Sequence, residues 1–292
     1  MTASEQLAQQ FEAHRGQLRL LAYRMLGSRA DAEDAVQETW LRLARVESDD
    51  VRNLGGWLTT VLARICLDML RSRTARREQP LDEHVPDPIV ELDTGNPEQQ
   101  AVLADSVGLA LLVVLETLSP AERLAFVLHD VFAVPFEQIA QILDRSPAAA
   151  KQLASRARRR VHGAPAPDHD FARQRALIDA FVSASRDGDF AALLAMLDPD
   201  VVLRADAGSG PLGPSRLVRG ASEVASRVLQ YARFARFARP VLVNGTPGLV
   251  AAPGGRVIAV MSITAHAGRV TEINVLADPE RIQGLDLPDF PP

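Results

Sequence analysis

The chain has 292 residues, of which 47% are hydrophobic, and it carries a formal net charge of −5. This length predicts two or three domains with buried cores, and the net acidity argues against a protein that coats nucleic acid indiscriminately. No apolar run approaches the roughly 18 residues that a membrane span needs, and the polar N-terminus is not typical of a signal peptide. The single cysteine, Cys66, excludes a disulfide framework or a cysteine metal cluster and is expected in a core. We therefore expect a cytoplasmic protein with no metal site and no cofactor.

Three helices are predicted over 4–26, 31–46 and 54–77, because apolar residues recur there at three- and four-residue spacing. The second helix has an acidic and polar outer face, and the third ends in a cluster of arginines. Taken singly, such charged faces are most often solvated helix surfaces. Trp40 and Trp57 are likewise more typical of core aromatics than of nucleic-acid contacts.

Residues 79–103 are predicted to form an extended acidic linker that contains four prolines. A mostly apolar helix over 104–118 follows. The next helix is expected over 120–131, where Ser119 and Glu122 form a capping box and Pro120 occupies the first helical position.

The segment from Pro135 to Val161 predicts a helix-turn-helix. Its first helix carries an apolar stripe, Asp144 and Arg145 form the turn, and Ser146 is a good N-cap for the second helix. Three alanines at the start of that helix allow close approach to a surface, and basic residues follow at phosphate-contact positions. This arrangement is typical of a helix that enters the DNA major groove. The alternative is an arginine-rich, solvated helix end.

The residues after 168 predict a helix, a second short helix, a strand, a third helix and then a β-meander, with a hairpin turn at Ala267 and Gly268. This order resembles the SnoaL-like, nuclear-transport-factor-like (NTF2-like) α+β cone. Asp206 and His266 are the candidates for acid–base chemistry in such a cone. A lone histidine on a strand is more often structural, so we expect no catalytic residues. Small-molecule binding in the cone remains an alternative to a regulatory surface.

Three motifs in order give the chain its resemblance to a known family. They are DAEDAVQETWLRL at 31–43, GGWLTTVLARICLDMLRSRTARRE at 55–78, and the helix-turn-helix. Together they resemble an extracytoplasmic-function (group IV) sigma factor of the sigma-70 family. The resemblance implies two all-α sigma domains, a region two helical bundle and a region four helix-turn-helix, followed by the α+β cone. The expected boundaries are 1–78 for region two, 79–103 for the linker, 104–163 for region four and 169–292 for the cone.

The resemblance also implies partners and residue roles. The partners are core RNA polymerase, through its largest-subunit coiled coil and its flap, and promoter DNA. The residues implied in polymerase binding are Asp34, Gln37 and Glu38. Those implied at the −10 element, with an extruded base held by the loop 47–53 and the start of the third helix, are Asn53, Trp57, Arg64, Arg71, Arg73, Arg76 and Arg77. Those implied at the −35 element are Lys151, Gln152, Ser155, Arg156 and Arg159.

Some members of this family carry a fused SnoaL-like domain, and local sequence resembles that subgroup. HVPDPIV at 84–90 resembles its linker motif, DAGSG at 206–210 stands at its DGGGK-like loop, and DPERI at 278–282 stands at its NPDKL motif. The loop departs from the pattern by lacking two glycines and the lysine. The resemblance implies that the cone regulates the sigma regions through an intramolecular contact. We expect the loop Asp206–Pro214 and the segment Asp278–Leu287 to make this contact with the linker segment His84–Val90. The residues implied in it are Pro86, Pro88, Asp206, Gly208, Gly210, Asp278 and Pro279.

The resemblance therefore predicts a promoter-specificity subunit that is not an enzyme. The competing hypothesis is a DNA-binding repressor fused to a ligand-binding or enzymatic cone. A repressor has no use for an acidic polymerase-binding helix together with a basic promoter-melting helix.

Overall fold

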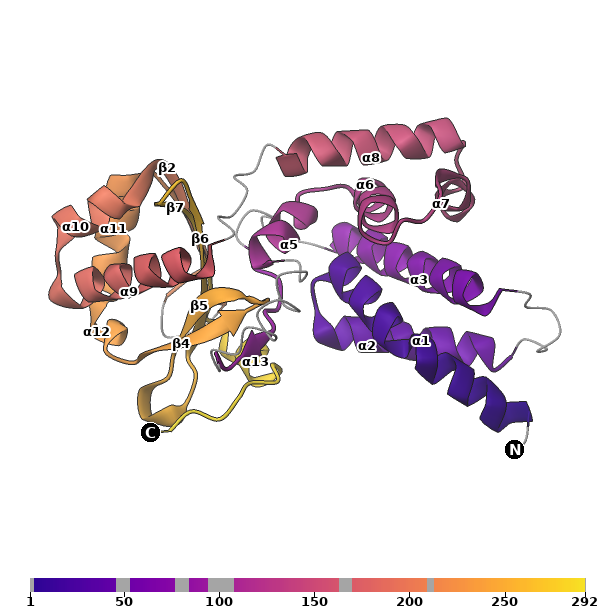
Figure 1. Ribbon diagram of the computed structural model, residues 1–292, viewed down its shortest axis with the longest axis horizontal. Helices are drawn as coiled ribbons and strands as arrows, with labels where there is room; N and C mark the ends of the chain where they lie inside the picture. Colours follow the sequence, from indigo (N-terminus) through magenta and orange to yellow (C-terminus); the bar gives the residue numbers. More distant parts are fainter. Residues whose placement is uncertain are drawn as a thin grey trace. The chain divides into compact units, whose positions relative to one another are not determined.

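The computed structural model describes residues 3–45, 53–76, 84–93, 108–162, 170–208 and 213–291. It divides into two compact units, the first formed by residues 1–79 with 114–163 and the second by residues 80–113 with 164–292 (Figure 1). The described part of the predicted linker, residues 84–93, is therefore grouped with the C-terminal part of the chain. The predicted four-part division remains a prediction.

The first unit begins with three helices, α1 (Ala3–Leu26), α2 (Arg29–Leu43) and α3 (Leu54–Arg76). They form at the predicted places, and the Ser28 hydroxyl caps α2 by accepting from the amide of Asp31. Cys66 is fully buried, as predicted, and burial raises the pKa of its thiol to about 12. Trp40 is half-buried, with its ring 5.1 Å from that of Phe11.

A second group of helices follows in the chain. It comprises α5 (Leu109–Glu116), α6 (Pro120–Phe126), the π turn η3 (Val127–Val131), α7 (Phe136–Leu143) and α8 (Pro147–His162). The predicted capping box at Ser119 and Glu122 is present. The helix predicted over 120–131 is confirmed, with its last turn in π geometry. The helix predicted over 104–118 is shorter at its C-terminus, and its residues 104–107 lie outside the described ranges.

Two buried arginines join these helical groups within the first unit. Arg123 of α6 donates from Nε and Nη2 to the carbonyl oxygen of Arg24 at 3.3 and 3.2 Å. The guanidinium of Arg24 lies 5.5 Å from the ring centre of Phe132. Because the last carbonyls of a helix lack intrahelical partners, Arg123 satisfies a group that burial would otherwise leave unpaired.

The second unit contains a curved sheet whose described strands lie in the order β1-β4-β5-β6-β7-β2-β3. The strands are β1 (Val90–Glu91), β2 (Leu197–Asp206), β3 (Arg216–Arg219), β4 (Ala238–Val243), β5 (Thr246–Ala251), β6 (Ala259–His266) and β7 (Arg269–Leu276). All neighbours are antiparallel except β2 and β7, which are parallel. We call residues 170–208 and 213–291 the cone.

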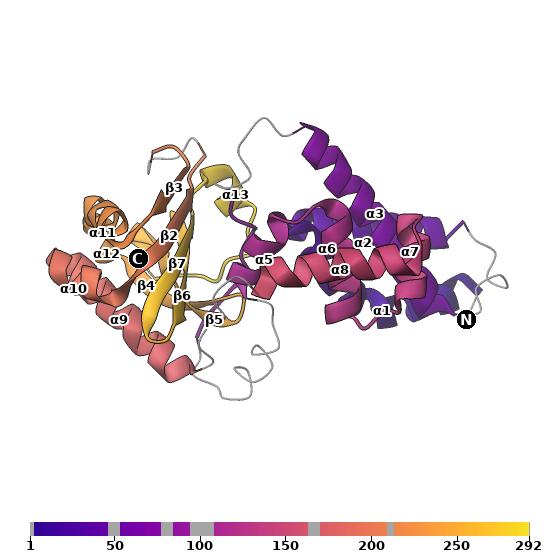
Figure 2. The same ribbon diagram turned by 90° about the horizontal axis from the view of Figure 1, so that it is seen from above.

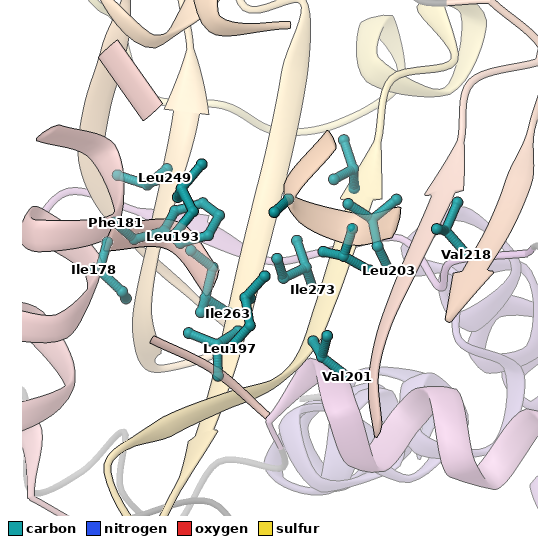
Figure 3. Packing of buried hydrophobic residues seen from close by; sticks show 14 of the residues in the cluster. Ile178, Phe181, Leu193, Leu197, Val201, Leu203, Val218, Leu249, Ile263 and Ile273 are labelled. Atoms are coloured by element: carbon teal, nitrogen blue, oxygen red, sulfur yellow. The ribbon is translucent and has the colours of Figure 1, made fainter. Parts of the chain in front are cut away.

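Four helices cover one side of this sheet in both views (Figures 1 and 2). They are α9 (Phe171–Asp187), α10 (Phe190–Met196), α11 (Ala221–Gln230) and α12 (Ala232–Ala235). The core lies between helices and sheet, where Phe181, Leu193, Leu203 and Ile273 pack together (Figure 3). The expected α+β architecture is confirmed.

Several elements of the cone differ from the expectation. The third helix predicted for the cone is broken at Tyr231 into α11 and α12. Strands β3 and β1 and the short helix α13 (Pro279–Gln283) were not expected. Each unexpected element has five residues or fewer, too few to show a hydrophobic period. The predicted hairpin at Ala267 and Gly268 is confirmed, with φ of 51° and 76°. Across the described part of the chain, no helix is both long and apolar enough to span a bilayer.

Candidate functional site

The turn between α7 and α8 has the geometry predicted for a helix-turn-helix. Asp144 ends α7 in the left-handed conformation, with φ and ψ of 53°, and the amide of Arg145 donates to the carbonyl of Ala140 at 2.9 Å. The Ser146 hydroxyl then accepts from the amide of Ala149 at 3.2 Å, which caps α8. The turn is thereby fixed by the left-handed backbone of Asp144, by one backbone hydrogen bond and by the Ser146 cap.

The two faces of α8 are chemically distinct. Ala150, Ala154 and Ala157 are fully buried against the rest of the domain. Every residue predicted at the −35 element is exposed on the opposite side: Lys151, Gln152, Ser155, Arg156 and Arg159.

Two other arginines of α8 have structural partners instead. Arg158 pairs with Asp130 at 2.6 Å, and Arg160 pairs with Glu122 at 3.2 Å. Burial alone would raise the pKa of Glu122, but hydrogen bonds from the Ser119 hydroxyl and amide and the charge of Arg160 outweigh it and lower that pKa. The basic run therefore contains both residues that hold α8 in place and residues that point away from the domain.

The acidic face of α2 carries the residues predicted to bind polymerase. Asp34 and Gln37 are exposed, whereas Glu38 is half-buried and pairs with Arg42 at 2.8 Å. The three positions fall on one face, at spacings of three and four residues. This face therefore carries an exposed carboxylate at Asp34 and a carboxylate paired with Arg42 at Glu38.

The residues predicted at the −10 element are distributed along α3. The side-chain oxygen of Asn53 accepts from the amide of Gly56 at 3.0 Å and so caps the helix, and Trp57 is half-buried. Arg64 and Arg71 are exposed. Arg64 donates to the carbonyl of Gln141 at 3.3 Å, and Arg71 lies 3.6 Å from Asp68.

The three remaining arginines of this set lie at the end of α3. Arg73 pairs with Asp31 and donates to the carbonyl of Leu26 at 2.8 Å, so these contacts must break before it can bind a phosphate. Arg76 is the last residue of α3, and its side chain lies outside the described part of the structure. Arg77, like the loop 47–52, lies outside the described residues.

A separate cluster binds the linker to the cone within the second unit. The Asp206 carboxylate accepts from the amide of Val85 at 3.1 Å and from Nη1 of Arg281 at 2.6 Å, and it lies 3.1 Å from Nδ1 of His84. Arg281 also donates to the carbonyl of Val85 at 2.6 Å and pairs with Asp87. We call His84, Val85, Asp87, Asp206 and Arg281 the linker clamp.

Neighbouring residues position the clamp. Asp278 caps α13, its carboxylate accepting from the amide of Glu280 at 2.9 Å, while Pro279 occupies the first turn. Gly208 has a φ of 50°, and a Cβ there would overlap the Asp278 carboxylate. Pro86 and Pro88 are buried in the linker. Gly210 lies outside the described residues.

The linker also adds a strand to the sheet. Val90 and Glu91 form β1 and pair with β4. The side chain and backbone of Asn244 exchange hydrogen bonds with the backbone of Ile89, at 3.0 and 2.8 Å. The predicted segment His84–Val90 therefore lies against the cone near the two loops from which a contact was expected.

Asp206 and His266 are not brought together as an acid–base pair. In the strand register Asp206 faces Leu276 of β7, whereas His266 faces Arg269, seven residues away on the same strand. That separation is about 23 Å at the usual strand rise. Among the described residues, no group of three His, Cys, Asp or Glu side chains could hold a metal ion.

Comparison with known proteins agrees with this geometry. The family models for sigma-70 region 2 and sigma-70 region 4 match residues 10–76 and 108–161. The probable ECF RNA polymerase sigma factor SigI of Mycobacterium tuberculosis (strain CDC 1551 / Oshkosh) is 36% identical, over 98% of both chains. The ECF RNA polymerase sigma factor SigJ of M. tuberculosis (strain ATCC 25618 / H37Rv) is 39% identical, over 95% of this chain and 94% of its own.

This chain is an ECF sigma factor. The crystal structure of M. tuberculosis SigJ superposes with a TM-score of 0.76 at 34% identity and covers 96% of this chain and all of that one. The likeness therefore extends through the cone as well as the two sigma regions. It favours the sigma-factor hypothesis over a repressor fused to a cone.

Sequence reasoning missed several members of the linker clamp in this sigma factor. His84, Val85, Asp87 and Arg281 lie inside motifs that resemble the family, but no role was predicted for them individually. The sequence could have indicated that Arg281 lies near Asp278, because it follows this helix cap by three residues. That spacing places the two side chains about one helical turn apart at the start of α13. Val85 contributes only backbone groups, which no side-chain pattern can indicate.

Proposed function

We propose that this sigma factor acts in the cytoplasm, binds core RNA polymerase and directs it to promoters, and that its cone regulates this activity within the same chain. The observation that carries the proposal is the exposure of all five predicted −35 residues on α8, opposite a face of buried alanines. The proposal assigns no catalytic activity to the chain.

The exposed face of α8 suits promoter recognition. An α-helix fits the major groove of B-DNA, and its long polar side chains reach base edges and phosphates there. Lys151, Arg156 and Arg159 supply the positive charge. Gln152 and Ser155 can donate to and accept from base edges.

Region two carries the residues for two further contacts, one with core polymerase and one with the −10 element. The exposed carboxylate of Asp34 and its neighbours on α2 would bind a basic surface of polymerase, which we propose is the coiled coil of the largest subunit. Region four would bind the flap of the polymerase. Asn53, Trp57, Arg64 and Arg71 would follow the non-template strand of the −10 element. Extrusion of a base costs a few kcal/mol, which stacking and pocket contacts offset.

The linker clamp supports regulation by the cone. It ties the segment between the two sigma regions to the C-terminal domain through a buried carboxylate and an arginine with several acceptors. Release or retention of this segment changes how far the two regions can separate, because a clamped linker is shorter than a free one.

The proposal is tested by measuring how charge reversal on the acidic face of α2 changes binding to core polymerase. The double variant Asp34→Arg with Glu38→Arg places positive charges against a basic partner, which costs several kcal/mol where the contact is desolvated. Pull-down of core polymerase should fall about tenfold or more.

The matched control is Asp179→Arg with Glu223→Arg, which makes the same change of charge at exposed positions of the cone. It should retain pull-down. Undiminished binding by the α2 variant, with a circular dichroism spectrum like that of the wild type, would refute the assignment.

A further inference from the structure

The cone contains a cavity that the proposed function does not use. It has a volume of about 150 Å³ and lies between the sheet and helices α9, α11 and α12. Its wall is dominated by apolar side chains, among them Phe181, Leu203, Leu249 and Ile273, which Figure 3 shows around the core. Asp206 is outside this wall, so the cavity is distinct from the linker clamp.

The volume sets the size of an occupant. Protein interiors contain few voids larger than a water molecule, and an apolar cavity of this size in another protein stays free of water and binds benzene. A cavity of 150 Å³ therefore has room for a ligand about the size of one aromatic ring. Its apolar wall offers little to hold a cluster of water molecules.

Two arginines line the cavity, Arg216 and Arg227, and the second gives it a polar anchor. Arg227 of α11 lines the wall, and 22% of its side chain is exposed. Its Nη1 donates to Gln230 at 2.7 Å and its Nη2 lies 4.0 Å from Glu223, but its Nε is buried with no hydrogen-bond partner. A buried donor without an acceptor is costly. A ligand that supplies an acceptor, above all an anionic one, removes that cost.

Three other side chains of the wall carry polar groups: Ser185, Arg216 and Tyr231. The Ser185 hydroxyl already donates to the carbonyl of Phe181 at 2.7 Å. Arg216 lies in β3 and is exposed. We propose that the cavity binds a small apolar carboxylic acid, with its ring or branched chain among the apolar side chains and its carboxylate on Nε of Arg227.

Fluorine NMR titration of the full-length protein tests this site with two probes, para-fluorobenzoate and fluorobenzene. Both should bind saturably, and the acid should bind about tenfold more tightly because it forms a charge-assisted hydrogen bond. Arg227→Met should remove that preference and leave fluorobenzene binding unchanged. The matched control is Arg233→Met, at an exposed arginine of α12 outside the cavity wall, and it should preserve the preference.

Two cavity-filling variants locate the probes. Ala235→Leu fills the cavity from α12 and Ala251→Leu from β5, so both should weaken binding of both probes about tenfold or more. Using one variant from each wall guards against misfolding of either one. The proposal is overturned if neither probe saturates, if both filling variants bind like the wild type, or if Arg227→Met keeps the preference for the acid. Binding is measured without polymerase or DNA, so these outcomes are independent of the proposed sigma activity.

Discussion

Asp206 shows how one carboxylate can hold two distant parts of the chain. Burial alone would raise its pKa, but hydrogen bonds from His84 and the Val85 amide and the charge of Arg281 outweigh burial and lower that pKa below its ordinary value of 3.8. The unfolded state therefore binds more protons near this pKa than the folded state does. The stabilisation that the Asp206 carboxylate gives the folded state is fully present above pH 3.8, the ordinary pKa of the group. It is lost as the pH falls through the lower pKa of Asp206 in the folded state.

Replacement of Asp206 with Asn should test this. At neutral pH the second unit should lose about 1–3 kcal/mol, since hydrogen bonds to a charged group are replaced by weaker ones. Thermal unfolding of the variant should also depend less on pH between about pH 5 and about pH 3 than that of the wild type. The exposed Asp179→Asn is the control and should keep the wild-type profile. A steeper decline for Asp206→Asn would contradict the assigned sign.

Arg156 is the residue of α8 whose loss separates base reading from phosphate binding. If it contacts a guanine edge, Arg156→Ala should cost about 1–3 kcal/mol and relax specificity at one position of the −35 element. If it contacts phosphate alone, affinity should fall evenly across sequences. The slope of log affinity against log salt concentration should then become shallower by about one. Fluorescence anisotropy with a promoter series, using polymerase holoenzyme, distinguishes these results.

Arg219→Ala is the matched control for that experiment, because Arg219 is an exposed arginine of β3 in the cone. It should leave DNA affinity unchanged. An Arg156→Ala variant that binds every promoter like the wild type would show that this face of α8 does not meet DNA.

At the scale of elements, the sharp turn between α7 and α8 depends on the left-handed conformation of Asp144. This conformation costs L-residues roughly 1–2 kcal/mol, less for Asp, and glycine adopts it freely. Asp144→Gly should therefore stabilise the first unit by about 0.5–1 kcal/mol, whereas the β-branched Asp144→Val should destabilise it.

Urea unfolding followed by tryptophan fluorescence measures this effect. The chain has two tryptophans, Trp40 and Trp57, and both lie in the first unit, so the signal reports on that unit. A lower midpoint for Asp144→Gly than for the wild type would contradict the account of the turn.

Strand β1 shows how little local sequence is needed once a partner strand exists. It has two residues, and its register is set by β4 and by the hydrogen bonds between Asn244 and Ile89. An isolated segment of this length has no stable structure. The linker is therefore ordered by the cone at this point.

At the scale of the whole molecule, covalent linkage makes a weak contact effective. A short tether keeps the cone near the sigma regions at an effective concentration roughly in the millimolar range. Truncation after Gly163 should consequently change run-off transcription from a cognate promoter severalfold. The yield should rise if the cone only occludes the sigma regions, and fall if the cone also holds them in a productive arrangement.

A point variant refines this experiment. Arg281→Ala removes the bonds to Asp206, Asp87 and the Val85 carbonyl while it leaves the rest of the cone in place. If the linker clamp carries the regulation, this variant should shift transcription in the same direction as truncation. Equal yields for full-length, truncated and Arg281→Ala proteins across a range of salt would reject regulation through this contact.

The sequence alone determined the long helices, the helix-turn-helix and the order of the domains. Periodic apolar residues in 54–76, and local signals such as Ser119, Ser146 and the Ala267–Gly268 turn, act over a few residues and so can be read directly. The exposed face of α8 follows from the same periodicity, because a helix that buries alanines at 150, 154 and 157 must expose the positions between them.

Only the tertiary structure decided the linker clamp, the cavity and the short strands. Val85 and Asp206 are 121 residues apart, and the bond between them uses a backbone amide that no pattern of side chains indicates. The same limit hid the ion pair between Arg73 and Asp31. Composition and periodicity specify which surfaces a segment can bury. Which partner each surface meets depends on contacts between residues far apart in the chain, and these form only when the whole domain has folded.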